Sequence, residues 1–236
     1  MNNRSVSHSD NQKRHPQTRP DSTRSQKTHN IPNIPVTRDR VERYIASPSS
    51  LEKHGYRLNN VTTSLEKTEK TANIVALKVH KTDCNGITLS AVDVQTGNTL
   101  LDREYNNPMA GTSTVDLNLC AELASKDVTT YMNRSTILVM YDGHTELNLL
   151  RIAHRHIVDL KILSEKAVVA VYGPKKEHLV HDLSELARGL GGLKLPRHCG
   201  SPLPEAQAMR AVVKGLLAEG GMEAWVGKDS KMSKTD

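Results

Sequence analysis

The chain of 236 residues contains no phenylalanine, and aromatic residues make up only 3% of it. Its core must therefore be built from Leu, Val, Ile, Ala and Met, which is sufficient when volume and pattern are right. The three cysteines, Cys84, Cys120 and Cys199, are far apart and odd in number. Because they form neither a CxxC pair nor a metal-ligand spacing, we expect an intracellular location, in the nucleus or cytoplasm.

Long apolar runs are also missing. None is long enough to cross a bilayer, so we expect no membrane partner. The first fifteen residues have no apolar h-region and do not read as a secretory signal. The length suits one domain of ordinary size plus a tail.

The net charge of +6 is concentrated at the start of the chain. Residues 1–40 hold eight Lys and Arg against three Asp and Glu, which is +5 and leaves the rest nearly neutral. Residues 1–36 are rich in polar residues and contain few apolar ones, so we predict a disordered basic tail. Its charges are dispersed, which favours a plain flexible tail over a dedicated nucleic-acid-binding arm.

Residues 37–72 form the next unit of the prediction, a helical lead-in followed by a polar linker. Apolar residues recur at helical spacing on both sides of Ser47 and Pro48, which predicts two short helices. We expect this lead-in to pack on the domain that follows.

Residues 73–220 carry the patterns of one α/β domain. Strands are predicted at 74–79, 87–94 and 99–105, joined as antiparallel neighbours by turns. A helix over 115–124, capped by Thr112 or Ser113, leads to a strand at 137–141, a helix and a short strand at 157–158. The apolar stretch 162–172 follows. Leucines 179, 183, 186 and 190 predict one helix, a last helix begins near 202–205, and residues 221–236 are expected to be a flexible tail.

Residues 137–159, ILVMYDGHTELNLLRIAHRHIVD, combine a strand, a helix and a strand with acidic groups at the joints. Asp142 and Glu146 lie near the start of the helix, and Asp159 ends the second strand. Carboxylates at strand ends suit a metal site, and they equally suit helix N-termini.

This segment resembles the second motif of the DEDDh-type 3′–5′ exonucleases, in particular the eukaryotic (fungal-type) RNA exonuclease branch. Members typically read I-L-V-G-H-S-x-x-N-D-L-x-A-L-K-L-x-H-x-x-V-I-D-T, and the catalytic Asp falls on Glu146. The direct matches are Ile137, Leu138, Val139, Leu147, Leu150, His154 and Asp159. Residues 47–56 fit the S-P-x-x-L-x-x-x-G-Y segment that precedes the domain in such proteins, and the resemblance covers roughly residues 40–220. It implies an RNase H-like fold with a mixed sheet led by three antiparallel strands and flanked by helices, in agreement with the pattern of elements.

The resemblance also implies a reaction, hydrolysis of a phosphodiester at a 3′ end with two divalent cations held by carboxylates. The first motif places an Asp and a Glu on alternate strand positions, where this chain has Lys78 and His80. In the third motif Glu205 stands for the metal-binding Asp and Gly200 for the His general base. His198, two residues earlier, is a candidate displaced base.

All five catalytic positions thus depart from the family pattern, three by residue type and two by length. We interpret the domain as inactive or strongly impaired, with no cofactor expected; Mg²⁺ or Mn²⁺ at Glu146 and Glu205 is expected only with residual activity. An ion pair of Lys78 with Glu146 or Glu205, where the metals would sit, is a further hypothesis.

Three functions stay open at this stage. The first is association with RNA or single-stranded nucleic acid without hydrolysis. The second is residual hydrolysis, with Glu146, Glu205, Asp142 and His198 as makeshift ligands and base. The third is a protein-interaction module on the same scaffold. His154 and His156 are interpreted as capping or surface residues and Asp159 as a residue that orients a loop.

Overall fold

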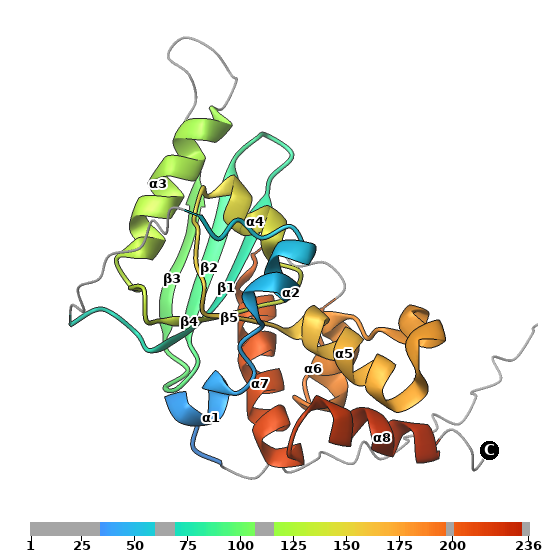
Figure 1. Cartoon of the computed structure of the whole chain (residues 1–236). Helices are drawn as coiled ribbons and strands as arrows, with labels where there is room; N and C mark the ends of the chain where they lie inside the picture. The colour runs from blue at the N-terminus through green and yellow to red at the C-terminus, as the bar shows by residue number, and fades with distance from the viewer. Residues whose placement is uncertain (1–33, 60–68, 107–115, 197–200, 233–236) are drawn as a thin grey trace, which may run out of the picture.

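The computed structural model describes residues 34–59, 69–106, 116–196 and 201–232. The elements follow in the order α1 (Arg38–Glu42), α2 (Pro48–Lys53), β1 (Ile74–Lys81), β2 (Ile87–Asp93), β3 (Thr99–Tyr105), α3 (Leu117–Thr129), β4 (Ile137–Met140), α4 (His144–Leu149), β5 (Ile157–Asp159), α5 (Leu160–Tyr172), the 3-10 helix η1 (Pro174–Leu179), α6 (Leu183–Gly189), α7 (Leu203–Glu219) and α8 (Met222–Met232). Together they form an α/β protein whose sheet is flanked by helices (Figure 1).

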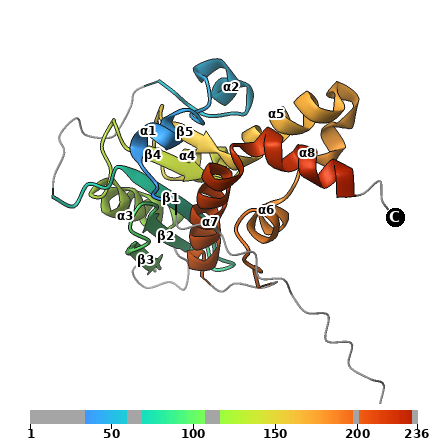
Figure 2. The ribbon, with the colours of Figure 1, turned by 90° about the horizontal axis from the view of Figure 1, so that it is seen from below.

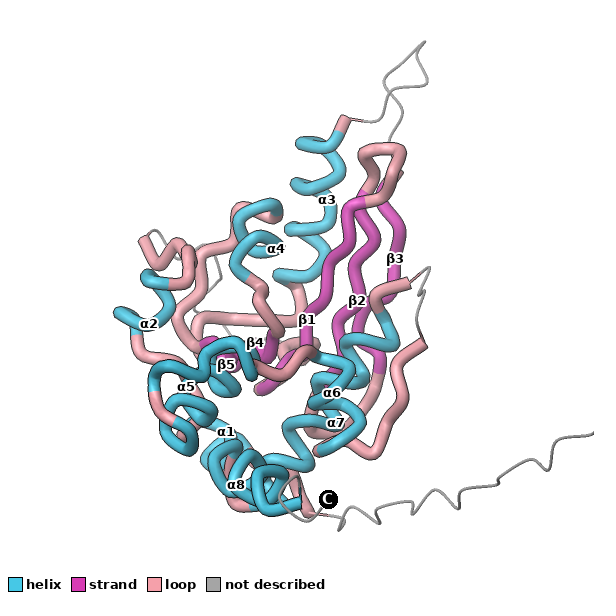
Figure 3. The backbone as a smooth tube through the Cα atoms, turned by 90° about the vertical axis from the view of Figure 1, so that its right-hand side faces the viewer, coloured by secondary structure: helices cyan, strands magenta, loops and turns pink. Residues whose placement is uncertain are grey.

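The sheet has five strands in the order β3-β2-β1-β4-β5. The first three strands of the chain pair antiparallel, as predicted, and run side by side (Figure 3). β4 pairs parallel to β1, and β5 pairs parallel to β4. The sheet is therefore mixed, with its two short strands added on the side of β1 that β2 leaves open.

Alternate residues of β1 contribute to opposite layers of the core, as the pleat of a strand requires. Ile74 and Ala76 belong to the cluster formed with α1, α5, α6, α7 and α8. Val75 and Leu77 belong to the cluster formed with α2, α3 and α4. Helix α7 packs along β1 and β2, as Figure 2 shows. The same alternation decides on which face the polar residues at the end of β1 lie.

The two short helices predicted before the sheet are present and pack on the domain. Ser47 caps α2, and Val41 and Leu51 are fully buried, one in each layer of the core. The N–H of Ala46 donates to the carbonyl of Ile157, 2.9 Å away in the last strand of the sheet. The lead-in therefore also covers part of the β5 edge, which would otherwise present free backbone groups.

The prediction for the start of α3 is corrected. The helix begins after Asp116, whose carboxylate accepts hydrogen bonds from the backbone N–H groups of Asn118 and Leu119. Thr112 and Ser113, the predicted caps, lie outside the described residues. A carboxylate is an equally good cap and also suits the positive end of the helix dipole.

The single helix predicted from the leucine spacing at 179–190 is wrong. Leu179 ends η1 and is 41% exposed, so it does not share the buried face of the other three leucines. Helix α6 begins only after Asp182, where Asp182 and Glu185 form a capping box that stops the helix from extending backward.

The apolar stretch 162–172 is most of helix α5.

The flexible tail predicted over residues 221–236 is also corrected, because Met222–Met232 form α8. Gly220 ends α7 in the left-handed conformation and lets the chain turn back. Met222 and Val226 are then buried against the layer that contains α5 and α7. Within the described residues, no helix combines the length and the apolar composition that a membrane span needs.

Candidate functional site

The polar end of β1 and the first turns of α4 and α7 meet at one place. Lys78 and His80 are alternate residues of β1 and so lie on one face of the strand, the face that α7 covers. The Nζ atom of Lys78 lies 2.6 Å from Oε1 of Glu146 and 3.5 Å from Oε2 of Glu205. The Nε2 atom of His80 lies 2.8 Å from Oε1 of Glu205. The hypothesis of an ion pair at Lys78 is thus confirmed, with both carboxylates as partners.

Glu146 is held from two sides. It lies in the first turn of the short helix α4, directly after the loop that follows β4. Its Oε2 atom accepts a hydrogen bond of 3.0 Å from the backbone N–H of Val79, while Oε1 faces Lys78. Both oxygens are therefore engaged, and the residue is 9% exposed. Such a carboxylate is positioned as a structural anchor between α4 and β1.

Glu205 lies in the first turn of α7, where a negative charge is favoured by the helix dipole. Its two oxygens contact different partners, the imidazole of His80 at Oε1 and the ammonium group of Lys78 at Oε2. The three elements β1, α4 and α7 are thus tied together by one group of four side chains, which we call the Lys78 cluster (Lys78, His80, Glu146 and Glu205).

The electrostatics of the Lys78 cluster follow from its burial and its opposite charges. At Lys78, burial would lower the pKa, but Glu146 and Glu205 together outweigh it and hold the pKa above its usual value. At Glu205, burial is likewise outweighed, by His80 and Lys78, and the pKa is lowered. At Glu146, burial is the strongest influence and raises the pKa despite the nearby ammonium group. Glu146 is therefore the carboxylate of the cluster that takes up a proton first when the pH falls.

The residues of the Lys78 cluster do not fit a pair of divalent cations. Mg²⁺ and Mn²⁺ need several oxygen ligands, and here the two carboxylates are bridged by an ammonium group that repels a cation. The one imidazole present, His80, is engaged with Glu205. Across the described parts of the chain, no three His, Cys, Asp or Glu side chains are grouped so that they could hold a metal ion.

The other sequence candidates lie elsewhere. Gly200 and His198 fall outside the described residues. Asp142 does not join the Lys78 cluster, because its Oδ2 atom lies 2.7 Å from Nζ of Lys161. His154 is corrected from a capping or surface residue to a buried one, whose Nε2 atom lies 2.6 Å from the carbonyl oxygen of Thr136.

Asp159 orients the loop that follows β4, both directly and through Tyr56, a residue that the sequence patterns did not single out. Its Oδ1 atom accepts from the N–H of Asp142 at 3.2 Å and also caps α5. Its Oδ2 atom accepts from the hydroxyl of Tyr56, which itself accepts from the N–H of Gly143 at 2.9 Å. The G-Y pair at residues 55–56 was the available signal, since it ends the matched upstream segment. The lead-in thereby positions the loop that precedes α4 and Glu146.

No protein-family model, curated protein or solved structure matches the chain.

Proposed function

We propose that the chain is an exonuclease-like protein with an RNase H-like fold that associates with RNA or single-stranded nucleic acid and does not hydrolyse it. The observation that carries the proposal is the position of Lys78, whose ammonium group lies 2.6 Å and 3.5 Å from the two carboxylates that the resemblance assigns to metal binding. An internal cation thus takes the place of the catalytic ones.

The magnitude of this effect is large. A unit positive charge about 4 Å from the ammonium group of Lys78 would be repelled by about 4 kcal/mol at an effective dielectric constant of about 20. A divalent ion would meet roughly twice that repulsion, and it would also have to compete for carboxylate oxygens that already have partners. Metal-assisted activation of water is therefore disfavoured at this place.

The sheet supports the fold assignment in the proposal. Three antiparallel strands come first, and the two parallel strands β4 and β5 follow on the other side of β1, separated by α4. The residues that the resemblance places in three separate motifs, Lys78 and His80, Glu146 and Glu205, come from β1, α4 and α7 and meet within hydrogen-bonding distance. Such a meeting is what an alignment to one active site requires.

A second function is favoured by the charge balance of the Lys78 cluster. Because the ammonium group is matched by Glu146 and Glu205, little of its charge is available for a phosphate, and binding would depend on basic residues outside the cluster. Residues 1–40 hold most of the net charge of the chain. A protein-interaction module that keeps only the scaffold predicts that removal of residues 1–36 abolishes all affinity for RNA and DNA.

The test uses the full chain with fluorescent single-stranded RNA and DNA, scored for retardation and for 3′ shortening in Mn²⁺ and in EDTA. We expect retardation that is equal in both conditions and no shortening. Shortening that requires Mn²⁺ and is abolished by Glu146→Gln would refute the loss of hydrolysis. No retardation at all would leave the protein-interaction module.

A variant with a restored acidic site tests the role of Lys78 directly. Lys78→Asp/His80→Glu brings four carboxylates together, so we expect it to be destabilised without metal and to gain thermal stability with Mn²⁺. Binding at about 100 times the Kd contributes about 2.7 kcal/mol. The control, Lys81→Asp/Lys126→Glu, places two acidic residues at exposed lysine positions outside the cluster and should show no Mn²⁺ response beyond that of the unmodified chain. A specific Mn²⁺ response in the unmodified chain would contradict the reasoning.

A further inference from the structure

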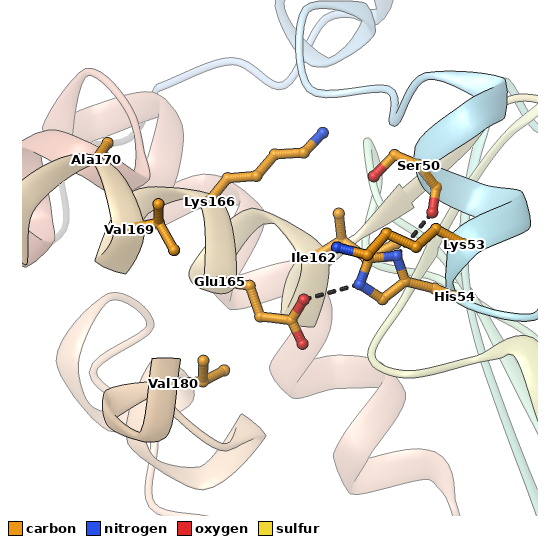
Figure 4. A pocket seen from close by; sticks show the side chains of 9 residues that line it. All are labelled: Ser50, Lys53, His54, Ile162, Glu165, Lys166, Val169, Ala170 and Val180. Carbon is orange, nitrogen blue, oxygen red and sulfur yellow. Dashed lines mark hydrogen bonds and ion pairs between the residues drawn. The ribbon is translucent and has the colours of Figure 1, made fainter. Parts of the chain in front are cut away.

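A pocket of about 680 Å³ lies between α2 and α5, outside the Lys78 cluster. One wall is the end of α2, the other is the middle of α5, and a residue after η1 closes the lower side (Figure 4). The lining residues are Ser50, Lys53, His54, Ile162, Glu165, Lys166, Val169, Ala170 and Val180. Small-molecule sites commonly have volumes of about 300–1,000 Å³, so the size suits a small organic ligand. We call this place the α2–α5 pocket.

The two walls are linked by one imidazole. The Nδ1 atom of His54 lies 2.7 Å from the carbonyl oxygen of Ser50, and its Nε2 atom lies 2.8 Å from Oε2 of Glu165. The imidazole thus connects the backbone of α2 to the side chain of Glu165 on α5. The arrangement is not a base that activates a nucleophile, because neither ring nitrogen faces a hydroxyl or thiol group.

Two lysine ammonium groups lie at the opening of the pocket. Lys53 projects from the α2 wall and Lys166 from the α5 wall, and both side chains extend toward the space between the helices (Figure 4). Both residues are exposed, and neither ammonium group forms an ion pair with a described residue. The pocket thus has two lysine ammonium groups against the single carboxylate of Glu165, which already contacts His54. The surplus is positive.

The remaining lining is apolar. Ile162 is almost fully buried and lies at the base of the pocket, and Val169, Ala170 and Val180 continue the apolar surface along α5 and the segment after η1. Figure 4 shows Val169, Ala170 and Val180 away from the end of α2 that carries Lys53 and His54, and Ile162 beside that end. The pocket therefore has a cationic end and an apolar end.

We propose that the α2–α5 pocket binds a small amphiphilic anion, with its anionic head group at Lys53 and Lys166 and its apolar body over Ile162, Val169 and Val180. Charge complementarity selects the sign of the head group, because a cationic ligand would meet the two ammonium groups of Lys53 and Lys166. Burial of the apolar body supplies affinity in proportion to the area removed from water. A carboxylate and a phosphate monoester carry the same head-group chemistry, and the experiment separates them.

The test is a methyl NMR titration of the full chain with octanoate, octyl phosphate and 1-octanol. We expect saturable shifts of the Ile162, Val169 and Val180 methyl groups with the two anions, and the anion that saturates at the lower concentration identifies the preferred head group. The neutral alcohol should bind at least about tenfold more weakly than the better anion, since it lacks the attraction to two ammonium groups.

Variants make the test specific to the head-group contacts. Lys53→Met/Lys166→Met should weaken binding of the better anion by about tenfold, while the matched control Lys126→Met, an exposed lysine on α3, should leave it unchanged. Equal affinity for octanol and the better anion would overturn the proposal. The same holds for an unchanged affinity in the double variant, or for the absence of saturable shifts with either anion.

Discussion

Replacing Lys78 by methionine removes the ammonium group from the Lys78 cluster while keeping an unbranched side chain of similar length. Glu146 then has only the Val79 N–H as a partner, and Glu205 keeps His80. The side chains of Lys78 and Glu146 are only 15% and 11% exposed, so water can replace little of what is lost. Removing one member of a buried pair typically costs about 3–5 kcal/mol of unfolding free energy.

The protonation of Glu146 sets an upper limit to this cost. Glu146 can avoid being a buried unpaired charge by taking up a proton in the folded state. Protonating a carboxyl group with an ordinary pKa of 4.5 at pH 7 costs about 3.4 kcal/mol, at 1.36 kcal/mol per pH unit. Partial exposure lowers the cost further. We therefore expect Lys78→Met to lose about 2–3 kcal/mol at pH 7, or roughly 4–12 °C in Tm for a domain of this size.

The pH dependence of this loss has a definite sign. Burial already raises the pKa of Glu146, and removal of Lys78 raises it more. A folded-state pKa above the unfolded value means that stability is lost as the pH rises from 4.5 through the folded pKa. The deficit of Lys78→Met relative to the unmodified chain should thus be largest at pH 7 and above, and should shrink toward pH 4.5.

The assay is urea unfolding at pH 7 and pH 5, with two comparison variants. Lys78→Met/Glu146→Gln should recover most of the lost stability, because it removes the unpaired charge and keeps an acceptor for the Val79 N–H. Lys161→Met, which breaks a more exposed pair with Asp142, should cost under about 1 kcal/mol. A loss at Lys78 no larger than that at Lys161, or one that grows on acidification, would refute the assignment of Lys78 as the internal counter-ion.

Three further predictions concern other parts of the fold. Burial lowers the pKa of His154 from 6.5 to about 4, so between these pH values the unfolded state binds a proton that the folded state does not. The unfolding free energy of the chain, measured by urea unfolding, should therefore fall by about 2 kcal/mol from pH 7 to pH 5. The variant His154→Gln should remove this contribution. Tyr56→Phe leaves Asp159 and the Gly143 N–H without their shared partner and should cost about 2–3 kcal/mol by the same assay, whereas an unchanged stability would mean that the lead-in does not hold the loop. Val226→Ala should lower the unfolding free energy by about 2 kcal/mol in thermal unfolding, because it removes two buried methyl groups; no change would mean that α8 does not pack on the domain in solution.

Several elements were readable from the sequence because their signal is local. The alternation in 87–94 and the hairpin turn that follows predicted β2 and β3 to within a residue, since both depend on neighbours along the chain. Where the pattern depended on distant partners, prediction failed. Residues 222–232 are polar enough to read as a tail, and only the layer formed by α5 and α7 gives Met222 and Val226 a surface on which to be buried.

The sequence by itself determined which residue types occupy the positions that the resemblance aligns with catalytic ones: a lysine and a histidine on alternate residues of one strand, and two glutamates near the starts of two later helices. The alignment also suggested the hypothesis that Lys78 pairs with Glu146 or Glu205. It did not determine which of them the lysine contacts, since the three elements are far apart along the chain and only the crossing of α7 over β1 brings them together.

Only the tertiary structure determined that every carboxylate oxygen of the Lys78 cluster has a partner. Each oxygen of Glu146 and Glu205 has a partner, and one of these partners is a backbone N–H of β1 that no side-chain pattern reveals. The tertiary structure alone also placed His54 of the lead-in against Glu165 of α5 and so formed the α2–α5 pocket. The physical reason is the same in both cases: charge and hydrogen-bonding capacity are properties of a residue, whereas their satisfaction depends on which distant residues the packed layers bring within about 3 Å.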